Sequence, residues 1–160
     1  MTEKIHKKFL IFLLLFVSTV LFLAYLIEYK LGHQPCRLCL YERIPYFISI
    51  LLMIKILFIK GNEKITLLIL SIIFFISAGL AFYHFGIEQG FFKESLACTI
   101  ENLSDTLSKE EILKQLKQNI ISCKDVGFKI FGFSLATINT LFSIFLSGIF
   151  IKLFINYGKN

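Results

Sequence analysis

Two cysteines separated by two residues, Cys36 and Cys39, are the side chains of this sequence best suited to do chemistry. A C-x-x-C spacing brings both sulfurs within disulfide reach on a single turn of chain. Arg43 follows four positions after Cys39, and a strongly apolar run begins at Ile44. A thiol pair at the edge of a hydrophobic segment predicts redox chemistry at a membrane surface.

The residues around the pair suggest how its chemistry is controlled. If Cys39 begins a helix, the unpaired N–H groups and positive end of that helix stabilise a thiolate. Arg43 then projects from the same helical face. Its guanidinium can hold the thiolate and hydrogen-bond a ligand oxygen that becomes anionic. The alternative interpretation of Arg43 is interfacial anchoring, with Glu42 beside it.

The composition indicates an integral membrane protein. The chain has 160 residues, of which 56% are hydrophobic and 18% charged, and its mean hydropathy is +0.76. A soluble domain of this size could not bury so much apolar surface. The net charge of +6 would suit nucleic acid, but the lysines flank the apolar runs and form no stripe. We therefore predict a lipid bilayer as partner and no nucleic acid.

Four apolar runs predict four transmembrane helices, since about 20 residues cross the hydrocarbon core as a helix. The first run is too long for a signal peptide and ends in a poor cleavage site, so we expect it to be retained. The second is short unless its helix begins near Leu38 or Cys39. Pro45 also favours a start nearby, because proline is best tolerated in a first turn. The predicted spans are 9–27, 40–59, 65–85 and 130–151 of a single all-α membrane domain, 1–160.

The two loops on one face, about 28–39 and 86–129, hold all four cysteines: Cys36, Cys39, Cys98 and Cys123. Disulfide chemistry belongs in an oxidising compartment. The other face has very short segments dense in lysine, as cytoplasmic segments do. Both observations predict that the N- and C-termini are cytoplasmic and that the cysteine loops lie outside.

The second outer loop carries a capping-box signature, Ser108-Lys109-Glu110-Glu111. Beyond it, apolar residues fall on one helical face. This pattern predicts a short amphipathic helix in the membrane interface; a solvated helix docked on its own loop is the alternative.

The cysteines alone leave several interpretations open. A C-x-x-C can be a redox pair, half of a metal site or a coincidence. A four-cysteine zinc site usually has two close pairs, whereas Cys98 and Cys123 are 25 residues apart. A structural staple between these two could contribute roughly 3–4 kcal/mol, but it would not need the other pair at the membrane edge. A disulfide-stapled or metal-binding membrane protein without redox turnover is therefore the competing hypothesis.

The sequence resembles the bacterial disulfide bond formation protein B (DsbB) family over nearly its whole length. The resemblance lies in the motif Pro35-Cys36-x-x-Cys39-Leu40-Tyr41-Glu42-Arg43, the four spans and the position of Cys98 and Cys123 in the second outer loop. Two span ends are also similar to that family, Ala81-Phe82-Tyr83-His84 and Gly132-Phe133-Ser134-Leu135-Ala136. Vitamin K epoxide reductase-like enzymes also pair loop cysteines with a C-x-x-C, but in the reverse order along the chain.

The resemblance implies a protein-disulfide:quinone oxidoreductase of the bacterial inner membrane. It would reoxidise a periplasmic DsbA-like thiol oxidase and pass the electrons to ubiquinone or menaquinone. Carried over by motif, Cys98 forms the mixed disulfide with the partner, and Cys123 resolves it and relays electrons toward Cys36. Cys39 is implied as the thiolate beside the quinone and Arg43 as the ligand of its oxygen. His84 either contacts the quinone ring or is an ordinary interfacial histidine.

Overall fold

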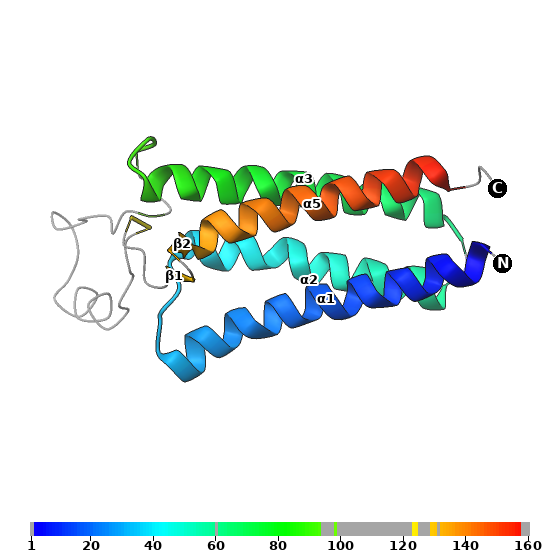
Figure 1. Cartoon of the computed structure of the whole chain (residues 1–160), viewed down its shortest axis with the longest axis horizontal. Coiled ribbons are helices and arrows are strands. Elements are labelled where there is room, and N and C mark those ends of the chain that lie inside the picture. The colour runs from blue at the N-terminus through cyan, green and yellow to red at the C-terminus, as the bar shows by residue number, and fades with distance from the viewer. Residues whose placement is uncertain are drawn as a thin grey trace, which may run out of the picture.

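The structure, a computed structural model, describes residues 2–59, 61–93, 98, 123–124, 129–130 and 132–157. Within these residues the chain forms an antiparallel bundle of four helices, α1 (Thr2–Leu31), α2 (Arg37–Phe58), α3 (Glu63–Glu88) and α5 (Leu135–Asn156) (Figure 1). Both termini lie at one end of the bundle, and the turn between α1 and α2 lies at the other. The C-x-x-C pair therefore lies at the end opposite the termini.

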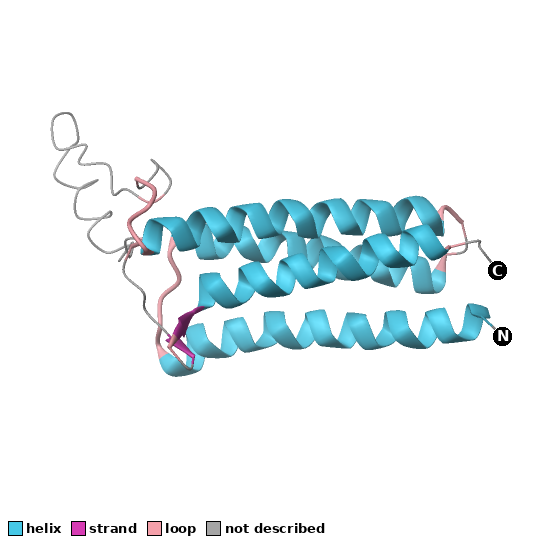
Figure 2. Ribbon diagram, turned by 45° about the horizontal axis from the view of Figure 1, so that its top comes forward, coloured by secondary structure: helices cyan, strands magenta, loops and turns pink. Residues whose placement is uncertain are grey.

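Three of the helices are long and apolar enough to cross a membrane: α1 from Lys7 onward, α3 and α5. Helix α2 runs beside them and has the same length as α5, 22 residues (Figure 2). Its charged residues Arg37, Glu42, Arg43 and Lys55 lower its apolar content. The all-α fold is thus confirmed, with three helices that meet the criterion for a span. The predicted amphipathic helix lies outside the described residues.

Helix α2 begins earlier than the sequence suggested. Cys36, and not Cys39, occupies the N-cap position, where its sulfur accepts a hydrogen bond from the backbone N–H of Cys39 at 3.3 Å. Pro45 consequently lies about two turns inside the helix, so the argument that placed it in the first turn was wrong. A proline inside a membrane helix is tolerated where neighbouring helices and side chains compensate for the missing backbone bond.

The segment before α5 also differs from the prediction, which began the fourth span at residue 130. Strands β1 (Lys129–Ile130) and β2 (Phe133–Ser134) pair antiparallel there. Gly132, between them, has a φ of 86°, which glycine adopts without strain. The hydroxyl of Ser134 then accepts the backbone N–H of Thr137 at 3.2 Å and caps α5. Helix α5 therefore begins at Leu135, five positions after the start of the predicted span.

Small residues bring α3 and α5 together. Ser71 and Ser147 each donate a hydroxyl to the other's carbonyl, at 3.1 and 3.0 Å. The hydroxyls of Ser77 and Ser143 lie 3.2 Å apart. In a membrane, small side chains allow backbones to approach closely, and interhelical hydrogen bonds add to the packing. These contacts fix how α5 is rotated against α3.

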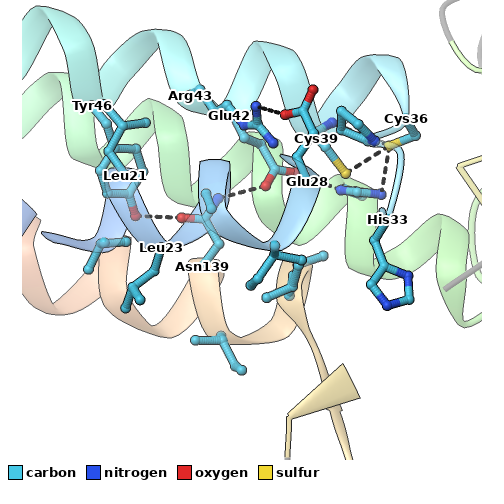
Figure 3. A pocket seen from close by; sticks show the side chains of 18 of the residues that line it. Leu21, Leu23, Glu28, His33, Cys36, Cys39, Glu42, Arg43, Tyr46 and Asn139 are labelled. Atoms are coloured by element: carbon cyan, nitrogen blue, oxygen red, sulfur yellow. Dashed lines mark hydrogen bonds and ion pairs between the residues drawn. The ribbon is translucent and has the colours of Figure 1, made fainter. Parts of the chain in front are cut away.

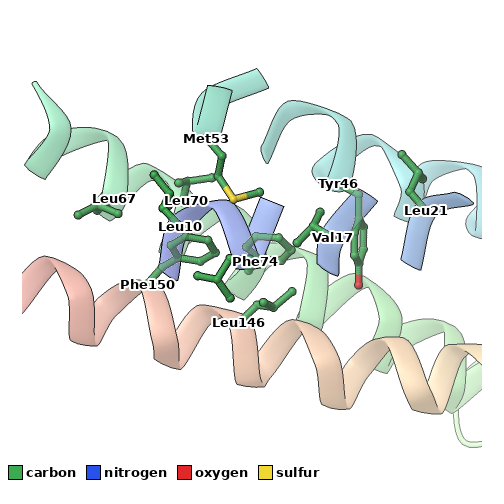
Figure 4. Packing of buried hydrophobic residues seen from close by; sticks show 11 residues of the cluster. Leu10, Val17, Leu21, Tyr46, Met53, Leu67, Leu70, Phe74, Leu146 and Phe150 are labelled. Carbon is green, nitrogen blue, oxygen red and sulfur yellow. The ribbon is translucent and has the colours of Figure 1, made fainter. Parts of the chain in front are cut away.

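The apolar core fills the middle of the bundle, away from the cysteines (Figure 4). The rings of Phe74 and Phe150 stack with centroids 5.6 Å apart, and the ring of Tyr46 meets Phe74 edge-on. All four helices contribute to this cluster, which consists of Leu10, Leu13, Val17, Leu21, Tyr46, Met53, Leu67, Leu70, Phe74, Leu146 and Phe150. The core sets the relative positions of the helix ends that carry the polar residues.

Candidate redox site

The C-x-x-C pair is reduced and lies at the start of α2. The sulfurs of Cys36 and Cys39 are 3.0 Å apart without a disulfide, and Cys36 is buried while Cys39 is partly exposed. Figure 3 shows both sulfurs at one end of a pocket that extends along the bundle. The first turn of α2 positions them, because Cys36 caps that turn and Cys39 belongs to it.

His84 of α3 lies directly against Cys36. Its Nε2 is 3.5 Å from the Cys36 sulfur, and its Nδ1 is 2.7 Å from Oε1 of Glu42. The side chains of His84 and Glu42 are only 4% and 9% exposed. A carboxylate can only accept hydrogen bonds, so Nδ1 carries the proton in this contact. The structure thus brings His84 together with the cysteine pair, near the C-terminal end of α3.

Glu42 joins three helices. Besides His84, its carboxylate accepts a hydrogen bond from the Asn139 amide of α5 at 2.6 Å. The Asn139 carbonyl oxygen in turn accepts the hydroxyl of Tyr46 at 2.5 Å (Figure 3). Buried polar groups require such partners, since an unsatisfied one costs about 1–3 kcal/mol. The result is a continuous hydrogen-bonded network from Cys36 toward the core.

Sequence reasoning missed the roles of Glu42, Asn139 and Tyr46. Glu42 was considered only as a neighbour of Arg43, although it follows Cys39 by three positions and so lies near it on a helix. Asn139 stands inside an otherwise apolar run, and strongly polar residues within spans usually face the bundle interior. The position of Asn139 in an apolar run could therefore have predicted a buried polar contact, but it did not indicate the partner.

Arg43 lies along the same pocket, where its guanidinium pairs with Glu28 of α1 at 2.5 Å. It also lies over the ring of Tyr25, 4.6 Å from the centroid, a favourable cation–π arrangement. The Arg43 and Glu28 side chains are 12% and 19% exposed. The pair connects α1 to α2 beside Cys39, and sequence reasoning had not identified Glu28.

A cavity of about 260 Å³ connects these groups. Apolar side chains of α1 and α5 form most of its wall, and polar groups gather at the end that holds Cys36 and Cys39. The apolar lining consists of Val20, Leu21, Leu23, Ala24, Ile27, Leu135, Ala136, Ile138 and Phe142, and the polar end includes Glu42, Arg43, His84 and Glu88. An apolar pocket with a few convergent polar groups is typical of a ligand site.

The second cysteine pair is joined. Cys98 and Cys123 form a disulfide with their Cα atoms 5.4 Å apart, and each is 1% exposed. Both belong to one buried cluster with Cys36, Leu38 and Ile87. The structure therefore places the two pairs at the same end of the bundle. With this disulfide formed, a four-cysteine zinc site is not assembled.

The environment of Cys36 favours its thiolate. The hydrogen bond from the Cys39 thiol, with smaller contributions from His84, lowers the pKa of Cys36 from 9.0 to about 4, against the opposing effect of burial. We expect alkylation of Cys36 in the reduced protein to stay fast from pH 9 down to about pH 5 and to fall as the pH passes through about 4. Rates measured by peptide mass spectrometry against pH test this.

The lowered pKa of Cys36 also makes the stability of the reduced protein depend on pH. A thiol whose pKa is depressed on folding stabilises the reduced folded state fully above pH 9, and this stabilisation is lost as the pH falls to about 4.

Labelling of Cys39 in a Cys36→Ser variant serves as the control and should show no plateau at low pH. An alkylation rate for Cys36 that instead follows an ordinary thiol near pH 9 would contradict the prediction.

A helical membrane bundle that holds a buried reactive dithiol, a second disulfide and an apolar cavity at one end defines a membrane thiol–disulfide oxidoreductase. The family model for disulfide bond formation protein DsbB matches residues 6–153. The chain belongs to this family, and it is a multi-pass membrane oxidoreductase that acts in disulfide bond formation.

One curated relative supports the family assignment over the full length. Uncharacterized protein RP370 of Rickettsia prowazekii (strain Madrid E) is 34% identical over 161 residues, which cover 99% of this chain and 93% of the relative. No solved structure matches the chain.

Proposed function

We propose that the protein reoxidises a periplasmic DsbA-like dithiol oxidase and passes the two electrons through its cysteine pairs to membrane quinone. The observation that carries this proposal is the position of Cys36 and Cys39. They lie between the Cys98–Cys123 disulfide, which shares their buried cluster, and the apolar cavity. Electrons can thus enter the pair from one side and leave it on the other.

The first transfer uses the Cys98–Cys123 disulfide. A thiolate of the partner attacks the sulfur of Cys98, the disulfide breaks, and Cys123 leaves as a thiolate. The partner's second thiol then displaces Cys98, so the partner becomes oxidised and this pair becomes a dithiol. Cys123 then attacks Cys36 of a Cys36–Cys39 disulfide and releases the Cys39 thiolate. Cys98 displaces Cys36 from this mixed disulfide, which re-forms the Cys98–Cys123 bond and leaves Cys36 and Cys39 as a dithiol. Free Cys36 and Cys39 beside a closed Cys98–Cys123 bond are the arrangement that follows such a transfer.

The cavity fits a quinone in its chemistry. Its apolar wall suits a lipid-soluble ring and tail, and Arg43 and His84 offer N–H donors at the polar end beside Cys39. When bound, quinone supplies a two-electron acceptor. Such an acceptor is needed because a DsbA-type partner, at about −120 mV, lies roughly 180 mV above ordinary structural disulfides, or about 8 kcal/mol for two electrons.

The chain's own residues prepare this step. The Cys39 thiol and backbone N–H, together with His84 Nε2, hold the charge on Cys36. Glu42 orients the imidazole, and Asn139 orients Glu42. The Glu28 carboxylate and the Tyr25 ring hold the Arg43 guanidinium at the cavity.

We further propose that α2 is a fourth membrane span, with both termini in the cytoplasm and the cysteine end in the periplasm of a bacterial inner membrane. The bundle supports this, because α2 runs along the three helices that are apolar enough to span and the termini share the end away from the cysteines.

The partner can be identified by trapping. We expect a Cys123→Ser variant to accumulate a mixed disulfide between Cys98 and the partner, because the free Cys98 thiolate attacks the disulfide of the oxidised partner and no Cys123 thiol is present to displace the partner from Cys98. Non-reducing electrophoresis of a periplasmic extract, followed by mass spectrometry of the cross-linked peptide, identifies the cysteines. A Cys98→Ser variant is the matched control and should trap nothing through Cys123. Equal adduct in both variants would contradict the assigned order.

The role of Arg43 can be measured with quinone. We expect Arg43→Ala to raise the KM for ubiquinone or menaquinone about 10- to 100-fold, because a hydrogen bond from a charged donor contributes about 1.5–3 kcal/mol. Anaerobic absorbance assays with the reduced partner give KM and kcat. Lys55→Ala, a cation at the other end of the same helix, is the control and should change neither. An unchanged KM in Arg43→Ala would contradict a role in quinone binding and would mean that Arg43 only pairs with Glu28.

The unmodified protein distinguishes the proposal from its alternative, a stapled or metal-binding membrane protein without turnover. Anaerobic reduction of added quinone by reduced partner, dependent on the protein, supports the redox function. Complete lack of turnover with either quinone would favour the alternative.

A further inference from the structure

We propose that Cys36, Cys39 and His84 form a site for a thiophilic divalent cation such as Zn²⁺, available only when the cysteine pair is reduced. The two sulfurs and Nε2 of His84 all lie within 4.8 Å of one another. Thiolate and imidazole are the ligands that zinc prefers in proteins. Such a site makes the enzyme sensitive to metal in one redox state.

The distances suit tetrahedral coordination. Zn–S bonds of about 2.3 Å and Zn–N bonds of about 2.0–2.1 Å place two sulfurs about 3.8 Å apart and a sulfur and nitrogen about 3.6 Å apart. The Cys36 sulfur already lies 3.5 Å from Nε2 of His84 and 3.0 Å from the Cys39 sulfur. The S–S distance must therefore increase by about 0.8 Å, and the Cys39 sulfur lies within 4.8 Å of Nε2 before any movement.

The histidine is already oriented as a ligand. Its Nδ1 is bound to Glu42, so Nε2 faces the Cys36 sulfur. Zinc-binding histidines commonly use a carboxylate on the second nitrogen in this way, which fixes the ring and raises its basicity. Asn139 holds the carboxylate from the other side. The supporting residues of a metal site are therefore in place.

Glu88 offers a carboxylate close to His84, although it lies outside the group of three whose ligand atoms are all within 4.8 Å of one another. Glu88, one turn beyond His84 on α3, has its Oε1 3.8 Å from Nε2 of His84, and its side chain is 6% exposed. Its other oxygen, Oε2, is buried without a hydrogen-bond partner among the described residues. A buried carboxylate oxygen without a partner is costly, and Glu88 lines the same cavity. A cation at the cysteine pair would satisfy this oxygen.

Binding is tied to the redox state. Zn²⁺ binds both sulfurs as thiolates and displaces to solvent the protons that Cys39 and Nε2 of His84 carry, whereas a Cys36–Cys39 disulfide offers no thiolate. A bound cation thus holds the pair reduced and removes Cys36 from exchange. The inhibition rests on the proposed function, but the binding does not.

The test uses the full chain in detergent, reduced anaerobically, incubated with Zn²⁺ alone and freed of excess metal by gel filtration. We expect about one zinc per reduced chain by elemental analysis and none after oxidation of the pair. His84→Ala and Cys39→Ser should each lose this zinc. Glu42→Gln should weaken binding about 10- to 100-fold, as for other residues that orient a metal-binding histidine. His33→Ala, a histidine of the same cavity outside the cluster, should bind normally.

Two results would overturn the site: reduced protein that retains no zinc, or a His84→Ala variant that retains as much as the unmodified chain. The second result would place the metal on the Cys98 and Cys123 thiols. Quinone reduction in metal-free buffer is measured separately on the same samples. Zinc binding without turnover would contradict the proposed function and leave the site standing, and turnover without zinc binding would do the reverse.

Discussion

We expect a Cys39→Ser variant to lose quinone reduction by about 10³-fold or more, a loss of the size seen when a reacting group is removed from an enzyme. A serine hydroxyl cannot form a disulfide with Cys36, so the pair can no longer hold two electrons. Cys39 also donates the hydrogen bond that contributes most to lowering the pKa of Cys36. An anaerobic absorbance assay with reduced partner and either quinone measures the loss.

The same sample contains its own control. Reduction of the Cys98–Cys123 disulfide by the partner does not require Cys39, so thiol labelling should show that pair becoming reduced at the normal rate. Turnover close to that of the unmodified protein would sink the assignment of Cys36 and Cys39 as the electron-carrying pair. Loss of both reactions would point to a damaged fold and would require the variant's unfolding temperature for comparison.

The second large effect is expected at Glu42. Replacing it with leucine leaves the buried donors of His84 and Asn139 without an acceptor. Breaking a buried charged network by removing one partner typically costs 3–5 kcal/mol, so we expect a loss of about that size in the free energy of unfolding. Denaturant titration in one fixed detergent measures it. Glu28→Gln is the control, because its carboxylate is more exposed than that of Glu42 and glutamine keeps an acceptor oxygen for Arg43, so we expect a smaller loss.

Glu42 also has a readout that packing alone would not change. In Glu42→Gln, His84 loses the carboxylate at Nδ1, so we expect the pKa of the Cys36 thiol to rise toward its ordinary value. The pH profile of alkylation at Cys36 reports this directly. An unchanged profile, or a Glu42→Leu variant as stable as the unmodified protein, would contradict the role of Glu42 as the junction of the network.

The sequence predicted the helices well because their signal is local. Three of the four apolar runs have the length of a span, and the C-x-x-C pair was expected at the start of the second helix. The helix was expected to begin near Leu38 or Cys39; it begins at Arg37, less than one turn earlier, and Cys36 is its N-cap. Pro45 misled the prediction because a packed bundle tolerates a proline that an isolated helix would not.

The polar network could not be predicted from local patterns. Glu42 and Asn139 are 97 positions apart, and Cys36 and His84 are 48 apart. Whether two such residues meet depends on how each helix is rotated about its axis, which the serine contacts between α3 and α5 and the aromatic core decide. A polar residue in an apolar run shows that some partner is needed, but not which one.

The three-helix junction at Glu42 has a consequence for biogenesis. Its partners come from α3 and α5, and α5 is the last of these helices to be synthesised and inserted. Until α5 docks, one oxygen of the carboxylate lacks the Asn139 amide and the cavity lacks one wall. The redox site is therefore complete only after α5 has been inserted. In a nascent or truncated chain, Cys36 and Cys39 would pass the export machinery while their site is still incomplete.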